Sequence, residues 1–298
     1  MGVLSSRPRV GPWVDPPRQD GRRFVVTGAS SGVGLMTARI LAHRGAHVVL
    51  AVRDVAKGEQ VAASIGGSSE VRRLDVADLS SVRAFAAEVG SVDVLVNNAG
   101  VMGLPFARSV DGFELQLATN HLGHFALANL LLPRIGDRVV VVSSRAHHTG
   151  DLDLSDLDWS RRGYQGYAAY AASKLANLLF LAELQRRLTA AGSTLRATGA
   201  HPGSTYTGIT QSGGNPVLAW IGRHGHPLVG MPPWRGALPS VYAATMDVPG
   251  NTFVGPHALG EMYGWPTSVG RSRSALDPDL ARRLWEASEA MTGVGFGL

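Results

Sequence analysis

Apolar runs of strand length alternate with stretches of helical periodicity along most of the chain. Seven runs have the length of strands, at residues 24–28, 47–52, 71–76, 92–98, 138–144, 195–201 and 251–256. Apolar positions recur at helical spacing at residues 33–44, 55–64, 79–88, 111–133, 167–191 and 277–291. This alternation predicts a doubly wound, Rossmann-type α/β fold, with helices on both faces of a mostly parallel seven-stranded sheet.

The first twenty residues do not share this pattern. Residues 1–20 hold four prolines and no apolar core segment, and they are expected to be an extension of the fold. No internal repeat or linker divides the remaining residues. We therefore expect residues 21–298 to form one domain.

Composition narrows the classes of function. The formal charge is +5 and no basic run exceeds two or three residues, so the chain has no basic stripe for nucleic acid. Cysteine is absent, which excludes disulfides, thiolate metal sites and cysteine nucleophiles. No secretory signal is visible, and apolar stretches such as LANLLFLAEL have about half of the ~20 residues that a membrane helix requires. We expect a cytoplasmic protein without a membrane span.

A glycine-rich loop, TGASSGVG, follows the first predicted strand and opens a predicted helix. Its glycines are Gly28, Gly32 and Gly34, spaced G-x-x-x-G-x-G. Such a loop lets backbone N–H groups approach a pyrophosphate, and the helix N-terminus adds partial positive charge. Three glycines could also make only a tight turn, but the position after strand one favours nucleotide binding.

Further motifs are predicted at the same edge of the sheet. NNAG (97–100) ends the fourth strand, Ser144 ends the fifth, and HPG (201–203) ends the sixth. Tyr170 and Lys174, in YAASK, lie four residues apart and therefore on one face of a helix. Each alone could be a turn, a strand cap, a surface pair or a proline stop. Their convergence at the carboxyl edge indicates a ligand site there.

Together these motifs resemble the short-chain dehydrogenase/reductase family, over about residues 20–290. The segments AVRDVAKGE, LATNHLGHF, SSRAHH and YAASKLAN are most similar to its retinol-dehydrogenase-like branch, and RRLWEASEAMTGV resembles actinobacterial members. The resemblance implies a hydride transfer between a nicotinamide cofactor and a carbonyl or alcohol.

The resemblance also implies roles for four catalytic residues. Tyr170 is expected to be the general acid, with Lys174 lowering its pKa and holding the nicotinamide ribose. Ser144 is expected to polarise the carbonyl, and Asn120 to help carry a proton-relay water. No metal site is expected, because His147 and His148 have no acidic partner at ligand spacing; they are expected to line the substrate entrance or face solvent.

Cofactor contacts are expected along the whole carboxyl edge. The resemblance implies contacts from Gly28, Ser30, Ser31, Gly32, Val33, Gly34, Arg53, Asp75, Val76, Asn98, Ala99, Gly100, Tyr170, Lys174, Pro202, Gly203, Thr205 and Thr207. Arg53 ends the second predicted strand, where an arginine accommodates a 2′-phosphate and an acidic residue selects NAD. NADP(H) is therefore predicted over NAD(H), unless Asp54 turns inward.

The predicted function is an NADP(H)-dependent oxidoreductase that interconverts a carbonyl and an alcohol. Residues 208–234 match the family's variable substrate lid, and their apolar composition predicts an apolar substrate. The alternatives are a dehydratase or epimerase on the same fold, and a non-catalytic NADP(H)-binding sensor. In the family, the helices predicted at 111–133 and 167–191 also form a dimer interface, so we expect a homodimer or homotetramer.

Overall fold

The computed structural model describes residues 15–205 and 230–298. Eight strands form one sheet in the order β3-β2-β1-β4-β5-β6-β7-β8. They are β1 (Arg23–Thr27), β2 (His47–Val52), β3 (Ser68–Arg73), β4 (Val92–Asn97), β5 (Ile135–Val142), β6 (Arg196–Ala200), β7 (Phe253–Ala258) and β8 (Tyr263–Ser268). All neighbouring strands are parallel except β7 and β8. The predicted Rossmann-type fold is confirmed, with one strand more than the seven expected.

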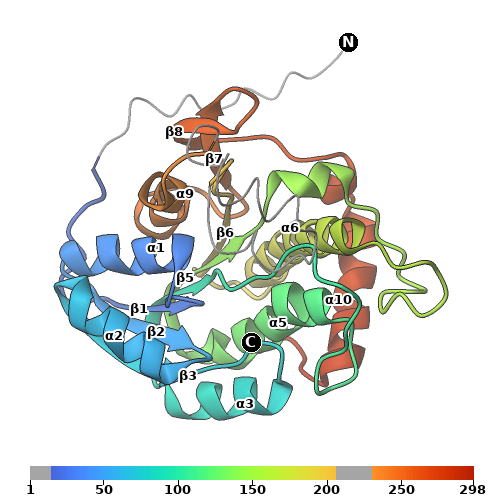
Figure 1. The fold of residues 1–298 in the computed structure, drawn as a ribbon, viewed down its shortest axis with the longest axis horizontal. Helices are drawn as coiled ribbons and strands as arrows, with labels where there is room; N and C mark the ends of the chain where they lie inside the picture. Colours follow the sequence, from blue (N-terminus) through green and yellow to red (C-terminus); the bar gives the residue numbers. More distant parts are fainter. Residues whose placement is uncertain (1–14, 206–229) are drawn as a thin grey trace.

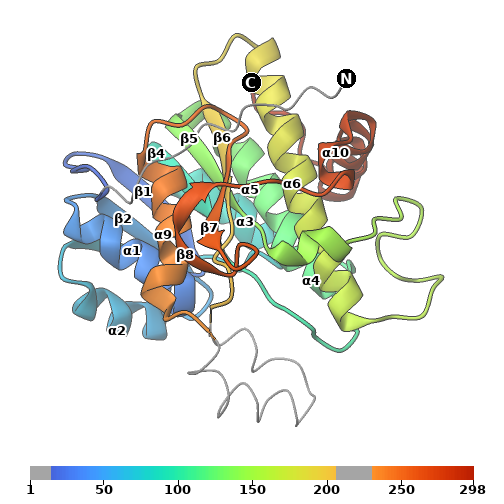
Figure 2. The same ribbon diagram turned by 90° about the horizontal axis from the view of Figure 1, so that it is seen from above.

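Helices cover both faces of this sheet. One layer contains α1 (Gly32–His43), α2 (Val55–Ile65) and α9 (Pro233–Thr245). The other contains α3 (Leu79–Glu88), α4 (Leu115–Leu117), α5 (Gly123–Leu131), α6 (Gly166–Ala190) and α10 (Pro278–Thr292). Figure 1 shows the labelled order of these elements, and Figure 2 shows α1, α2 and α9 on the side of the sheet opposite α6 and α10. Short irregular turns complete the chain: η1 (Ala118–Leu122), η2 (Leu132–Arg134), η3 (Arg145–Thr149) and η5 (Ser274–Leu276).

Two apolar cores hold the layers together. Side chains on opposite faces of the central strands are fully buried, as Val25 and Val26 of β1 show. Val25 belongs to the core shared with α5, α6 and α10, and Val26 to the core shared with α1 and α9. Burial of both faces explains why these strands are apolar without alternation.

The C-terminal helix covers the outer side of α6. Trp285 of α10 packs edge-on against Phe125 of α5, with ring centroids 4.8 Å apart, and stacks on Phe180 of α6 at 5.7 Å. A buried hydrogen bond of 2.8 Å joins His121 to Ser288 of the same helix. These are the helices expected to meet a second copy, and part of their surface is covered here by the chain's own α10. The homodimer or homotetramer stays a prediction.

Candidate active site

The glycine-rich loop runs from β1 to α1 and packs closely against the NNAG segment. A Cβ on Gly28 would lie 2.9 Å from the Cα of Ala99, and one on Gly34 would lie 2.4 Å from Asn98 Nδ2. Gly28 and Gly32 also have positive φ values, of 67° and 57°. These glycines therefore have a geometric reason to be present.

Thr27 joins the two segments through hydrogen bonds. Its Oγ1 accepts the backbone N–H groups of Asn98 and Ala99, at 2.8 and 2.9 Å. Its carbonyl accepts Asn98 Nδ2 at 2.8 Å. Ser31 is the N-cap of α1 but makes no side-chain capping bond, so the first N–H groups of the helix stay available for an anion. Ser30 and Val33 flank this position, and the cradle fits a pyrophosphate.

Gly100, Asn120 and Lys174 meet beside this loop. A Cβ on Gly100 would lie 3.1 Å from Asn120 Oδ1 and 3.3 Å from Lys174 Nζ. Asn120 lies in the π-helical turn η1, a local irregularity that often marks functional sites. Its side chain accepts from the backbone N–H of Val101 at 2.8 Å and donates to Ser173 Oγ at 2.9 Å. Asn120 is thus fixed between the NNAG segment and α6.

Tyr170 and Lys174 are almost entirely buried on one face of α6. Their exposed fractions are 8% and 4%. Burial raises the pKa of Tyr170 to about 12, against a hydrogen bond from Ser144 that lowers it. Desolvation of the phenolate thus dominates the Tyr170 pKa in this structure, and the lowering by Lys174 stays a prediction. Burial also lowers the pKa of Lys174 to about 8.

Two hydrogen bonds fix α6 against the end of β5. Ser143 Oγ donates to the carbonyl of Lys174 at 2.7 Å, and Asn177 Nδ2 donates to the carbonyl of Val142 at 3.0 Å. Ser144 follows directly, and its Oγ accepts the N–H of Ala146 at 3.2 Å. The sheet and the helix therefore hold Ser144 and Tyr170 at a fixed separation.

Two charged side chains follow the end of β2, the cation of Arg53 and the carboxylate of Asp54. The Arg53 side chain is exposed, and it makes no hydrogen bond or ion pair to another residue of the described ranges. The Asp54 carboxylate accepts the N–H of Lys57 at 3.0 Å and so caps α2. Asp54 is held in the cap, while Arg53 is available to a ligand.

Asp75 lies two residues beyond the end of β3. Its Oδ1 accepts the N–H of Ala77 at 3.0 Å. Val76 is buried, and a Cβ on Gly123 would lie 1.8 Å from its carbonyl oxygen. Only glycine in α5 allows this approach.

The HPG segment turns at the end of β6. Gly203 has a φ of 64°, and Thr205 Oγ1 donates to the carbonyl of Pro202 at 2.7 Å. A Cβ on Gly236 of α9 would lie 2.3 Å from Thr205 Oγ1. Thr207 and the predicted lid up to residue 229 lie outside the described residues.

Comparison with known proteins decides the family. The sequence profile described as short chain dehydrogenase matches residues 22–216. The chain belongs to the short-chain dehydrogenase family. It is an NAD(P)-dependent dehydrogenase that acts on CH–OH groups.

Individual relatives of this short-chain dehydrogenase agree over most of its length. Retinol dehydrogenase 13 from Homo sapiens is 39% identical, covering 92% of this chain and 85% of the relative. Polyprenol dehydrogenase from Mus musculus is 40% identical, covering 96% and 88%. A crystal structure of an uncharacterized protein from Mycobacterium Paratuberculosis is 51% identical with a TM-score of 0.85, covering 97% and 100%.

Three buried histidines of this dehydrogenase make hydrogen bonds at the carboxyl edge of the sheet. His201 was named only as part of HPG, and no role was expected for His124. His124 Nδ1 donates to the Asn120 carbonyl at 3.2 Å, so its Nε2 accepts from Thr27 Oγ1 at 2.9 Å. His201 Nδ1 accepts the N–H of Gly203 at 3.3 Å. Single histidines carry no periodic signal, so only their contacts reveal them.

The third histidine corrects an expectation. His147 is fully buried, while His148 faces solvent. His147 Nδ1 donates to the Ser144 carbonyl at 2.7 Å, and its Nε2 accepts the N–H of Ser272 at 3.1 Å. Burial lowers the pKa of His147 to about 4 and that of His124 to about 3, so both are neutral. His147 therefore braces the loop that follows β5 against Ser272 and does not face solvent.

Two negative findings bear on the site. Within residues 15–205 and 230–298, no group of three or more His, Asp or Glu side chains is arranged to hold a metal ion. Among the helices of the same residues, none has the length and apolarity needed to cross a bilayer.

Proposed function

We propose that this chain is an NADP(H)-dependent oxidoreductase that interconverts an apolar aldehyde or ketone and its alcohol. The observation that carries the proposal is the meeting of the half-buried Ser144 with the buried Tyr170, Lys174 and Asn120 at the carboxyl edge. A cofactor-binding sensor has no need of a complete proton-donating set.

The side chains suit proton transfer to a carbonyl oxygen. Because the pKa of Tyr170 is raised to about 12, its hydroxyl is protonated at neutral pH and can donate. Ser144 hydrogen-bonds the same oxygen and polarises the carbonyl. Lys174, with a pKa of about 8, is mostly cationic at neutral pH and stabilises the phenolate that Tyr170 leaves. The bound nicotinamide supplies the hydride.

The cofactor preference rests on the end of β2. The exposed guanidinium of Arg53 can form charge-assisted hydrogen bonds to a 2′-phosphate. Asp54, which would otherwise accept a ribose 2′-hydroxyl, is engaged in the cap of α2. These two side chains support NADP(H) over NAD(H).

The apolar substrate is supported by the relatives. Retinol and polyprenol, named in two relatives, are both apolar alcohols. Met102 packs against Tyr170, and Tyr167 places a half-exposed ring 6.2 Å from the Tyr170 ring. Part of the surroundings of the proton donor is thus apolar or aromatic.

A carbonyl panel tests the proposal directly. The purified protein is mixed with NADPH or NADH and with straight-chain aldehydes, ketones or small carboxylated carbonyls, and the nicotinamide absorbance is followed. We expect NADPH consumption with medium and long apolar aldehydes. No turnover of any carbonyl, or a preference for NADH and carboxylated substrates, would overturn the proposal.

A further inference from the structure

The tip of the β7–β8 hairpin lies against the catalytic edge. Ser204 donates its N–H to the carbonyl of Met262 at 3.0 Å, and a Cβ on Gly203 would lie 2.6 Å from that same oxygen. On its other side, a Cβ on Gly260 would lie 3.7 Å from Arg145 Nη2. Arg145 directly follows Ser144 in sequence. The tip, residues 259–262, therefore borders both the HPG turn and the catalytic loop.

The backbone of this tip is held in an unfavourable conformation. Leu259, Gly260 and Glu261 have successive φ values of 50°, 62° and 67°. Only glycine adopts this region without crowding its Cβ, so Leu259 and Glu261 are strained. Strained residues persist where surrounding contacts determine their position, and they gather at functional sites.

A buried histidine latches the tip to the HPG turn. His201 is fully buried, and its Nδ1 accepts the N–H of Gly203 at 3.3 Å. Its Nε2 therefore carries the ring proton and lies 3.4 Å from Glu261 Oε2, a close polar contact that does not reach hydrogen-bond geometry. The carboxylate, the imidazole and the backbone N–H form one chain of contacts from the tip to the turn.

The latched tip exposes apolar side chains. Leu259 is 69% exposed and Met262 is 38% exposed. Next to the tip, the Arg235 guanidinium lies over the rings of Trp234 and Trp265, at 5.3 and 5.6 Å. Figure 1 shows the hairpin beside α9, whose first turn carries Trp234. Strain and a buried latch thus hold an apolar surface at the rim of the site.

We propose that Leu259 and Met262 form a specificity wall that contacts the apolar part of the substrate. Glu261 and His201 are positioning residues that hold this wall against the HPG turn. The inference rests on the proposed function, because it presupposes a substrate with an apolar chain. It assigns chain-length selectivity to a hairpin that the predicted seven-stranded fold did not contain.

Steady-state kinetics with a short and a long aldehyde test the wall. For the double variant Leu259→Ser, Met262→Ser, kcat/KM with decanal falls by about tenfold and kcat/KM with propanal by less than about twofold. Leu276→Ser, at an equally exposed leucine of η5, is the matched control and changes neither value. An equal effect on both aldehydes contradicts the wall. If the wild type reduces no aldehyde at all, the proposed function itself fails.

Two substitutions of Glu261 test the latch. Glu261→Gln keeps a side chain of the same length with an oxygen beside His201 Nε2, and it is expected to keep the ratio of kcat/KM between decanal and propanal. Glu261→Ala removes this contact, and the ratio falls at least as far as in the double variant. Retention of the ratio by Glu261→Ala, with NADPH binding unchanged by titration, overturns the positioning role.

Discussion

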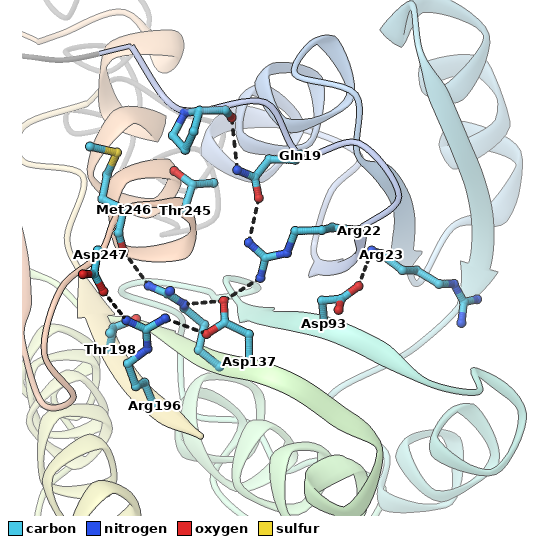
Figure 3. Close-up of polar contacts among 12 residues, drawn as sticks. Gln19, Arg22, Arg23, Asp93, Asp137, Arg196, Thr198, Thr245, Met246 and Asp247 are labelled. Atoms are coloured by element: carbon cyan, nitrogen blue, oxygen red, sulfur yellow. Dashed lines mark hydrogen bonds and ion pairs between the residues drawn. The ribbon is translucent and has the colours of Figure 1, made fainter. Parts of the chain in front are cut away.

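The two ends of the sheet differ in whether their charged and titratable side chains are paired with opposite charges. At the amino end, Asp137 of β5 pairs with Arg22, Arg138 and Arg196, at 2.5, 3.0 and 2.9 Å. Arg196 also pairs with Asp247 at 2.8 Å, and Figure 3 shows this network around Asp137. Here each charge has an opposite charge beside it.

At the carboxyl end, Lys174, His124 and His147 lack such partners among the described residues. Lys174 has no carboxylate partner in the described part of the chain, and burial alone lowers its pKa. His124 and His147 are neutral for the same reason. The amino end thus pairs its charges, whereas on the proposed function the carboxyl end keeps its polar groups available for ligands and proton transfer.

The largest expected effect is at the carboxyl end. Tyr170→Phe removes only the hydroxyl, so turnover falls by about 10² or more while NADPH binding is kept. Single-turnover reduction of an apolar aldehyde, with NADPH titrated separately, checks both parts. A variant that keeps most of the wild-type rate would show that another group is the acid.

At the amino end, the expected effect is on stability. Asp137→Ala leaves three arginines without their shared carboxylate and costs about 2 kcal/mol, between the values for exposed and buried pairs. Urea unfolding measures the loss, and Asp151→Ala, at an exposed position, is the control. The kcat of the folded Asp137 variant stays within about twofold of wild type, because the network is remote from Tyr170. A loss of kcat without a loss of stability would contradict the assignment of the Asp137 network to stability alone.

The next largest effect is expected on the preference for NADPH over NADH, at Arg53. Arg53→Ala is expected to weaken NADPH binding by about tenfold and leave NADH binding nearly unchanged, because only the 2′-phosphate contact is lost. Lys57→Ala, another exposed cation nearby in α2, is the control. Dissociation constants for both cofactors decide the point, and an unchanged preference refutes it.

The smallest effect concerns the neutral histidines. The pKa of His147 in the fold, about 4, is below its unfolded value, so protons bind the unfolded chain more tightly. Stability from this group is therefore lost as pH falls below about 6.5, by about 1 kcal/mol between pH 6.5 and 5.5. His147→Gln cannot titrate, so its stability changes less over this range. If the free energy of unfolding changes equally with pH in the variant and the wild type, His147 is not a source of the pH dependence.

Much of the fold could be predicted because both sheet faces are buried. The continuous apolar runs of β1, β4 and β5 reveal their positions directly. The third strand was placed three residues late, at 71–76, because Leu74 and Val76 are buried beyond the ladder, which ends at Arg73. The helix expected at 111–133 begins only at Leu115, since the preceding residues form a turn.

The sequence did not predict α9 and β8, because both contain glycine and proline. In α9, Pro233 occupies the first turn, Gly236 packs on Thr205 and Pro239 lies inside the helix, so the segment lacks an ordinary helical composition. In β8, which pairs with β7, Gly264 and Pro266 are residues that disfavour the prediction of a strand. The site motifs could be predicted from spacing, but the histidine braces and the raised Tyr170 pKa depend on burial.

Isotope labelling of the transferred hydride tests whether the protein reduces an apolar carbonyl with NADPH and Tyr170. NADPH carrying deuterium at the transferable nicotinamide position is incubated with decanal and the wild-type enzyme, and the alcohol is analysed by mass spectrometry. We expect decanol with one deuterium on the carbinol carbon, and strongly reduced formation of it by the Tyr170→Phe variant. Unlabelled alcohol, or no alcohol from any apolar aldehyde, would contradict it.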